Sequence, residues 1–302
     1  MSVVLLSGGT GGAKLARGLY DLLDGELAVI ANTADDIEIH GAYVSPDPDL
    51  VTYWLADRID ERGWGIEGDT FSAMAMLREL GTDVWFNLGD RDLAFCLERR
   101  RLLDAGSTLS DAHASLTRAL SVRARVIPMS DGRVRTAIRS GERTFTLQEY
   151  LIVHGGAPPI DDIRFDGAAD ASAAPAALEA IARAETIVIG PSNPIISIGP
   201  ILAIAQIRAA LEASRAPIVA VSPIVGGQVL KGPTAACLAW AGFSADARGV
   251  AGCYGALIDA IVADEPVAGD LPVHRCDTWM GGSTARRELA RETLAFADTL
   301  RR

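Results

Sequence analysis

The chain has 302 residues, of which 49% are hydrophobic and 22% are charged. This composition supports a sizeable core and excludes a largely disordered chain, and the length allows one large domain or two modest ones. The net charge of -11 repels phosphate backbones, so we expect no nucleic-acid partner. An anionic small molecule must then be bound locally, by backbone N–H groups, a few cations or a metal ion.

The cysteines and the apolar stretches indicate where in the cell the protein is found. No two of the four cysteines have a C-x-x-C spacing, which indicates reduced thiols in a cytoplasmic protein. The apolar N-terminus has no basic residues before it, which predicts a strand rather than a signal peptide. Residues 186–207 carry no charge, but Gly-Pro pairs at 190–191 and 199–200 interrupt them. Since a helix in lipid must satisfy its own backbone, we predict no membrane association.

Apolar runs and helical patterns alternate along the chain. Buried strands are predicted at 3–7, 27–31, 84–87, 186–189, 218–221 and 260–262. Helices are predicted at 13–23, 50–59, 70–80, 92–103, 201–213, 234–241 and 284–300, and a long polar loop at 32–49. This order predicts an α/β fold with a doubly wound, mostly parallel Rossmann-like sheet.

The middle of the chain has a different pattern. Residues 134–139 and 143–147 flank Ser140-Gly141-Glu142, which indicates a hairpin, and 160–165 add a further strand. Residues 167–177 are rich in Ala, Asp, Ser and Gly, and we interpret them as a flexible connection. We therefore expect a single α/β domain over 1–302, with an inserted β-containing subdomain at about 122–175.

The first candidate site is the glycine-rich segment 7–14, Ser-Gly-Gly-Thr-Gly-Gly-Ala-Lys, between a strand and a helix. Glycines there let the backbone approach a phosphate, and the helix N-terminus supplies oriented N–H groups. The segment is neither a Walker motif, because Ala13 and Leu15 stand at required positions, nor a dinucleotide fingerprint, because Lys14 replaces the third glycine. We predict phosphate binding with Lys14 on the ligand. A merely tight turn with a solvated lysine is the alternative.

The second candidate site comprises 32–36 and 45–49, which follow the second strand. Ligands bind at the carboxyl ends of the strands in open α/β sheets. The acids of these segments are suited to hold Mg²⁺ or to accept a hydroxyl proton. Ordinary turn and cap chemistry is the alternative, since turns use Ser, Pro and Asp.

Two further segments follow predicted strands. Residues 87–92, Asn-Leu-Gly-Asp-Arg-Asp, are suited to metal or phosphate binding; a helix-capping Asp90 with a surface ion pair is the alternative. Residues 190–194 place Ser192 and Asn193 between two prolines, which indicates a rigid binding loop or a plain turn. Trp64 is suited either to stack on a flat ring or to pack in the core.

Some chemistries lack support in this sequence. It contains no G-x-S-x-G, H-E-x-x-H or C-x-x-C motif, so acyl hydrolysis and structural zinc are not indicated. Group transfer at a phosphate needs positioning and charge neutralisation rather than a covalent nucleophile, and these segments suit it better.

Taken together, these segments resemble the 2-phospho-L-lactate transferase family (CofD, called FbiA in actinobacteria). The family's signatures are similar to SGGTG-x-x-K, NT-x-[DE]D, SPD-x-D, WGI-x-x-DTF, LGDRD, PMSD and GPSNP-x-x-SIGP. This sequence has them, in order, at 7–14, 32–36, 45–49, 64–71, 88–92, 128–131 and 190–200. Two features depart from some relatives: Gly12-Ala13 stands where they have Thr-Pro, and Asn87 stands at a variable, sometimes basic, position.

The resemblance implies a reaction and its participants. A guanosine diphosphate carrying phospholactate or phosphoenolpyruvate donates to the terminal ribityl hydroxyl of the deazaflavin Fo, GMP leaves, and the product is a precursor of coenzyme F-420. The resemblance also implies Mg²⁺ as cofactor and a homodimer.

The resemblance assigns the site residues as follows. The donor-binding set is Gly8, Gly9, Thr10, Gly11, Gly12, Lys14, Asn32, Thr33, Ser192 and Asn193. Asp49 and Asn87 would contact Fo, Arg91 would contact phosphate, and Asp35, Asp36, Asp90 and Asp92 would bind metal or activate the hydroxyl. Asp49, Asp36, Asp90 and Arg91 are the expected catalytic residues. We expect Asp49 at a solvent edge, where its replacement by alanine spares the fold and abolishes transfer.

Two other protein classes share part of this pattern. A related family of UDP-sugar-binding regulators has Asp-Asp-Gly-Gly-Ser-Ser-Gly after the second strand, but here Asp35-Asp36 is followed by Ile37-Glu38-Ile39. A dinucleotide-dependent oxidoreductase would need the fingerprint that Lys14 breaks. UDP-sugar binding without turnover would favour the first class, and oxidation of a reduced nicotinamide would favour the second.

Replacement of Lys14 by alanine is expected to weaken donor binding by roughly 1.5–3 kcal/mol, because one charge-assisted phosphate contact is lost. Calorimetric titration of both proteins with the donor nucleotide measures this difference. Equal affinities would remove Lys14 from the site.

Overall fold

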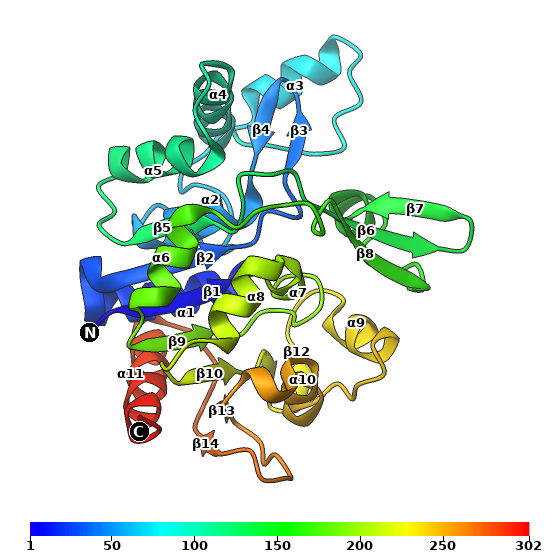
Figure 1. Ribbon diagram of the computed structural model, residues 1–302. Helices are drawn as coiled ribbons and strands as arrows, with labels where there is room; N and C mark the ends of the chain where they lie inside the picture. Colours follow the sequence, from blue (N-terminus) through cyan, green and yellow to red (C-terminus); the bar gives the residue numbers. More distant parts are fainter. Residues whose placement is uncertain (302) are drawn as a thin grey trace.

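The computed structural model describes residues 1–301. Its centre is a seven-stranded parallel sheet in the order β14-β13-β10-β9-β1-β2-β5 (Figure 1). The strands are β1 (Val3–Ser7), β2 (Leu27–Ala31), β5 (Arg125–Pro128), β9 (Thr186–Ile189), β10 (Ile218–Val221), β13 (Ala260–Ala263) and β14 (Val273–Arg275). The predicted doubly wound, Rossmann-like α/β fold is confirmed.

Apolar runs form the central strands because both faces of the sheet are covered. Val3 and Leu5 of β1 join one core cluster, which includes residues of α1 (Gly9–Leu23) and α11 (Ser283–Thr299). Val4 and Leu6 point to the other face and join a second cluster with residues of α6 (Pro175–Arg183), α8 (Ala205–Glu212) and α10 (Ala247–Tyr254). The central sheet is therefore a middle layer between two layers of helices.

The order in which successive strands are added to the sheet changes direction at β1. The chain passes from β1 to β2 and β5 on one side, then returns to β9, β10, β13 and β14 on the other. The carboxyl ends of β1 and β9, paired through Leu6 and Ile189, therefore flank the switch point where ligands bind in such sheets.

Smaller elements project from this sheet. The hairpin β3 (Ile37–Ile39) and β4 (Ala42–Val44) lies near α3 (Ser72–Glu79) and α4 (Asp90–Asp104), at the top of Figure 1. The antiparallel sheet of β6 (Arg135–Ser140), β7 (Arg143–Thr146) and β8 (Asp162–Asp166) extends to the right. The remaining elements are α2 (Pro46–Leu55), α5 (Leu109–Ala119), α7 (Gly199–Ala203), α9 (Thr234–Trp240), the hairpin β11 (Ile224–Val225) and β12 (Gln228–Val229), the 3-10 helices Asp24–Glu26 and Gly255–Leu257, and the π-helix Glu149–Val153.

Several predicted boundaries were wrong. The polar loop expected at 32–49 contains the β3–β4 hairpin and the start of α2, whose Pro46 suits a first helical position. The helix expected at 201–213 is two helices, because Ile204 has an extended ψ of 108°. The strand expected at 84–87 does not form; Phe86 packs instead in a small cluster with Val44 and Met74.

The inserted sheet lies within the predicted range 122–175, but β5 near its start belongs to the central sheet. Part of the predicted flexible connection at 167–177 is the start of α6. Within residues 1–301, no helix is both long and apolar enough to cross a membrane.

The centre of the sheet supplies a stability prediction. Ile187 of β9 is fully buried between β1 and β10, so Ile187→Ala should lower the free energy of unfolding by about 2–5 kcal/mol. Leu22, 41% exposed on α1, is the control, and its replacement by alanine should change that free energy by less than about 0.5 kcal/mol. Urea denaturation checks both, and equal effects would contradict this description of the core.

Candidate active site

The glycine-rich turn and the loop after β9 are in close backbone contact. The N–H of Gly8 donates to Ser192 Oγ at 3.3 Å. A Cβ atom on Gly11 would lie 1.9 Å from the carbonyl oxygen of Pro191, and one on Gly12 would lie 2.8 Å from Ser192 Oγ. Larger residues would separate the two loops, so the glycines are needed for this approach as well as for access to a ligand.

A cleft of about 630 Å³ opens over these two loops. Its walls bring together residues far apart in the sequence: the glycine-rich turn, the loop after β9, the segment after β10, and a segment before α11. Of the predicted donor-binding residues, those that line it are Gly8, Gly9, Thr10, Gly11, Lys14, Ser192 and Asn193. Trp64 and Trp279, which are 57% and 56% exposed, line it as well.

Cations converge on this cleft although the protein is acidic. Lys14 and Lys231, the only lysines of the chain, both line it. Among the ion pairs within residues 1–301, neither lysine has a carboxylate partner. Burial and the positive charges of Lys231 and Arg286 lower the pKa of Lys14. An anion bound here would relieve this repulsion.

An acidic wall begins at the glycine-rich turn. Asp47 accepts the N–H of Gly9 at 2.5 Å and an N–H of Asn32 at 3.0 Å, and Asn32 also donates to Asp35 at 3.1 Å. Asp47 thus connects the N-terminus of α1 to the acids after β2. Its segment, 45–49, was predicted to lie in the site, but with Asp49 as the catalytic residue.

Asp35 and Asp36 line a second cleft of about 410 Å³. Burial, together with the negative charges of Asp47 and Asp36, raises the pKa of Asp35. Burial also raises the pKa of Asp36 to about 7, against the opposing effect of Arg135. A divalent cation would stabilise such crowded carboxylates, so these oxygens fit Mg²⁺ in chemical type.

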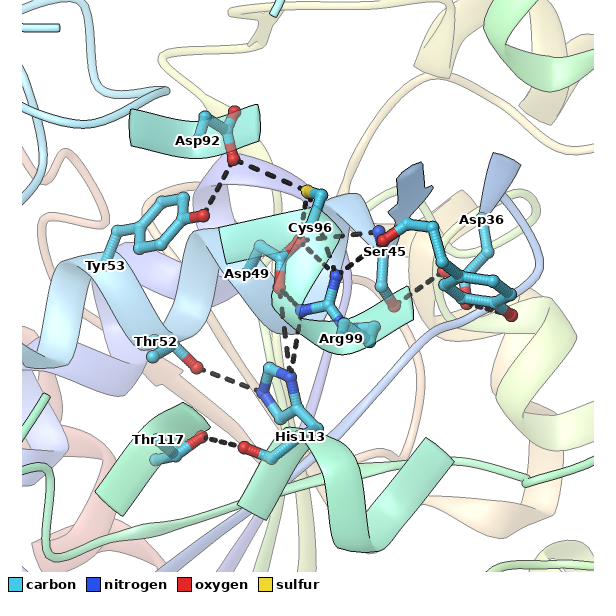
Figure 2. A network of polar contacts seen from close by, with 11 residues as sticks. Asp36, Ser45, Asp49, Thr52, Tyr53, Asp92, Cys96, Arg99, His113 and Thr117 are labelled. Atoms are coloured by element: carbon cyan, nitrogen blue, oxygen red, sulfur yellow. Dashed lines mark hydrogen bonds and ion pairs between the residues drawn. The ribbon is translucent and has the colours of Figure 1, made fainter. Parts of the chain in front are cut away.

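Asp49 lies in a buried network (Figure 2). It is 3% exposed and is paired with Arg99, which is fully buried. His113 completes the network, with Nδ1 at 3.4 Å from Arg99 and Nε2 at 3.1 Å from Thr52 Oγ1. The expectation of a solvent-edge Asp49 is therefore wrong: the first turn of α2 directs this side chain toward α4.

The same network holds the partners of Asp36. Asp36 accepts hydrogen bonds from Ser45 Oγ at 2.8 Å and from Tyr43 OH at 3.0 Å. Asp49 accepts the N–H of Ser45 at 3.4 Å, and Arg99 donates to the carbonyl of Tyr43 at 3.0 Å. The buried ion pair thus positions both donors to Asp36.

The segment 87–92 joins two helices. Asp90 accepts hydrogen bonds from Thr70 Oγ1 and from the N–H groups of Ser72 and Ala73, so it caps α3. Asp69 in turn accepts the N–H groups of Arg91 and Asp92 at the start of α4. Both carboxylate oxygens of Asp90 are therefore engaged, which agrees with the capping part of the alternative, whereas Arg91 donates to a backbone carbonyl instead of forming the expected surface ion pair.

The other residues of this segment have separate contacts. Arg91 donates to the carbonyl of Glu67 at 2.8 Å, and the exposed Asn87 accepts from Arg78 at 2.8 Å. Asp92 accepts from Tyr53 OH at 2.7 Å and lies near Asp49 and Cys96, close enough for the three to share an ion. A thiol is a poor Mg²⁺ ligand and Asp49 is already paired with Arg99, so this group does not fit Mg²⁺.

The predicted residues thus lie in several separate places. The glycine-rich turn, Lys14, Ser192 and Asn193 line the first cleft; Asp35 and Asp36 line the second; and Asn32, with the nearby buried Thr33, lies after β2. The segment 87–92 lies on the α3–α4 side. Lys231 and Trp279 were missed, because only the fold brings them to the turn, whereas Asp47 was predicted only as one of the acids of the second site.

The switch-point cleft, the glycine-rich turn and the seven-stranded parallel sheet define a Rossmann-like α/β protein. The model of the family described as 2-phospho-L-lactate transferase CofD matches residues 3–275. The chain belongs to this family of transferases, and the predicted resemblance is confirmed.

Relatives match over nearly their whole length. A 2-phospho-L-lactate transferase of Methanopyrus kandleri is 38% identical, with 99% of each chain covered. A phosphoenolpyruvate transferase of Kitasatospora aureofaciens is 41% identical, with 100% of this chain and 99% of the relative covered.

A solved structure of a upf0052 family protein from Bacillus halodurans is similar in fold. Its TM-score is 0.59 at 19% identity, and the match covers 88% of this chain and 82% of that one. At this identity the similarity shows the shared fold alone.

Replacement of Asp49 by alanine is expected to destabilise the protein by about 3–5 kcal/mol, because it leaves the Arg99 charge buried without its partner. Chemical denaturation measures this loss. The control is Asp111→Ala at an exposed helix start, which should cost no more than about 1 kcal/mol. Equal stability of Asp49→Ala and wild type would contradict the buried ion pair.

Proposed function

We propose that this protein transfers a 2-phospholactyl or phosphoenolpyruvyl group from a guanosine diphosphate donor to the ribityl hydroxyl of Fo (7,8-didemethyl-8-hydroxy-5-deazariboflavin). The products are GMP and coenzyme F-420-0 or its dehydro form. Membership of the family supports the reaction class. Its relatives carry both the 2-phospho-L-lactate and the phosphoenolpyruvate name, so either acid remains open.

The observation that carries the donor assignment is the cleft over the glycine-rich turn. Its floor is the N-terminus of a 15-residue helix, where the first-turn N–H groups other than that of Gly9, which donates to Asp47, favour a phosphate. Two lysines without carboxylate partners lie in its walls. An exposed tryptophan on each of two segments offers a flat apolar surface for a purine base. A nucleoside diphosphate has this combination of charge and ring.

Mg²⁺ would be held by Asp35, with Asp47 beside it, while Asp36 is left free of the ion to act as the base. When bound, the ion would neutralise charge on the diphosphate. Asp47 is buried and Asp35 is partly buried, so their negative charges repel one another. Asp90 and Asp92, which were also predicted as ligands, line neither cleft, and we leave them out of this set.

Transfer requires one bond to form and one to break. The ribityl oxygen of Fo forms a bond to the distal phosphorus, and the bridging oxygen leaves with GMP. The hydroxyl proton must pass to a base. Asp36 is suited to accept it, because burial raises its pKa to about 7. Asp49 and Arg99 act indirectly, by holding the residues that donate to Asp36.

A turnover assay tests this proposal. Purified protein, Mg²⁺ and Fo are incubated with each guanosine diphosphate donor, and mass spectrometry detects GMP and the Fo phosphodiester. We expect product with one of the two donors, and omission of Fo is the control. A folded protein that gives no product with either donor, but binds a UDP-sugar in a titration, would replace this proposal with the regulatory alternative. We also propose a homodimer, as the family resemblance implies, and sedimentation of the same sample tests it.

A further inference from the structure

Residues Leu230–Pro233, here called the lysine arm, form part of one wall of the first cleft. The arm follows the β11–β12 hairpin, whose turn is fixed: Asp264 accepts the N–H of Gly226 at 2.6 Å. By contrast, no hydrogen bond within residues 1–301 involves Leu230, Lys231 or Gly232. The arm is therefore anchored at its base, while its exposed part is free to adjust.

Lys231 extends from this arm to the opposite wall of the cleft. Its ammonium lies 5.4 Å from the centre of the Trp64 ring. Trp64 is next to Gly63, whose Cβ position would lie 3.9 Å from the Thr10 methyl carbon, so this wall adjoins the glycine-rich turn. An exposed cation–π contact contributes only about 0.5–1 kcal/mol. A phosphate would therefore compete effectively for the Lys231 ammonium.

The two lysines reach the cleft from distant parts of the chain. Lys14 is on α1, while Lys231 is on the arm more than 200 residues later. The two ammonium groups are close enough for Lys231 to lower the pKa of Lys14. Like charges held together without a carboxylate raise the free energy of the empty cleft, and a bound anion with several negative oxygens lowers it again.

We infer that Lys231 is a second phosphate-binding cation, which the lysine arm moves from the face of Trp64 onto the diphosphate of a bound nucleotide. This inference rests on the proposed function for the identity of the donor. The role of Lys231 itself requires less than the proposed reaction, because any ligand with two linked phosphates would bind in this way. Lys14 would approach the diphosphate from the helix side, and Lys231 from the arm.

The test compares three variants by calorimetry, with GDP, inorganic pyrophosphate and guanosine as ligands. Lys231→Met should weaken GDP and pyrophosphate binding about 10- to 100-fold, the range of one charge-assisted contact, and leave guanosine binding unchanged. Lys231→Arg should restore most of the GDP affinity because it keeps the charge. Arg215→Met, which removes an exposed charge outside both clefts, is the control and should bind GDP like wild type.

Tryptophan fluorescence gives a second measurement. GDP should change the emission of wild type as Lys231 leaves the Trp64 ring, and this change should shrink in Lys231→Met. Unchanged GDP affinity in Lys231→Met would overturn the inference, as would an equal loss for guanosine. Pyrophosphate binding that depends on Lys231, without any transfer to Fo, would retain the inference and overturn the proposed reaction.

Discussion

The buried ion pair between Asp49 and Arg99 is the interaction on which the acidic side of the site depends. Two charges removed from water are stable only if each finds partners, so this pair fixes the geometry around it. Arg99 also donates to the carbonyl of Tyr43, and Asp49 accepts the N–H of Ser45. Both neighbours donate through their hydroxyls to Asp36. One pair in the interior thus determines where Asp36 lies.

The site as a whole separates charge of opposite sign. The net charge of the chain is -11, yet the first cleft contains its only two lysines and the N-terminus of α1. Asp47 lies at the boundary, since it accepts the N–H of Gly9 on one side and that of Asn32 on the other. A phosphate placed beside this boundary would have cations and N–H groups on one flank and carboxylates on the other.

Much of the fold could be predicted from sequence because the central strands are apolar runs covered on both faces. The glycine-rich turn was also predictable, since its glycines are required both by the fold and by a phosphate. The strand predicted at 84–87 failed because an apolar run packs equally well against helices, as Phe86 and Leu88 do beside α3 and α4. Periodicity cannot distinguish these two environments.

The roles of Asp47 and Asp49 could not be separated from sequence. Both lie in the first turn of α2, two residues apart. At 3.6 residues per turn, their side chains point about 200° apart around the helix axis. One therefore reaches the glycine-rich turn and the other reaches Arg99. The sequence placed this segment near the site, but only the rotation of α2 decides which acid faces which neighbour.

The reciprocal caps of α3 and α4 have a consequence for how this chain tolerates change. Asp90, at the start of α4, binds the start of α3, and Asp69, before α3, binds the start of α4. These hydrogen bonds thus hold together the two ends of the segment from Asp69 to Asp90. Residues inserted between the exposed Thr82 and Asp83, just beyond the turn that ends α3, would lengthen the segment between Asp69 and Asp90 without passing strain to either cleft. Within a family that shares one sheet, this is a place where members can differ in length at little thermodynamic cost.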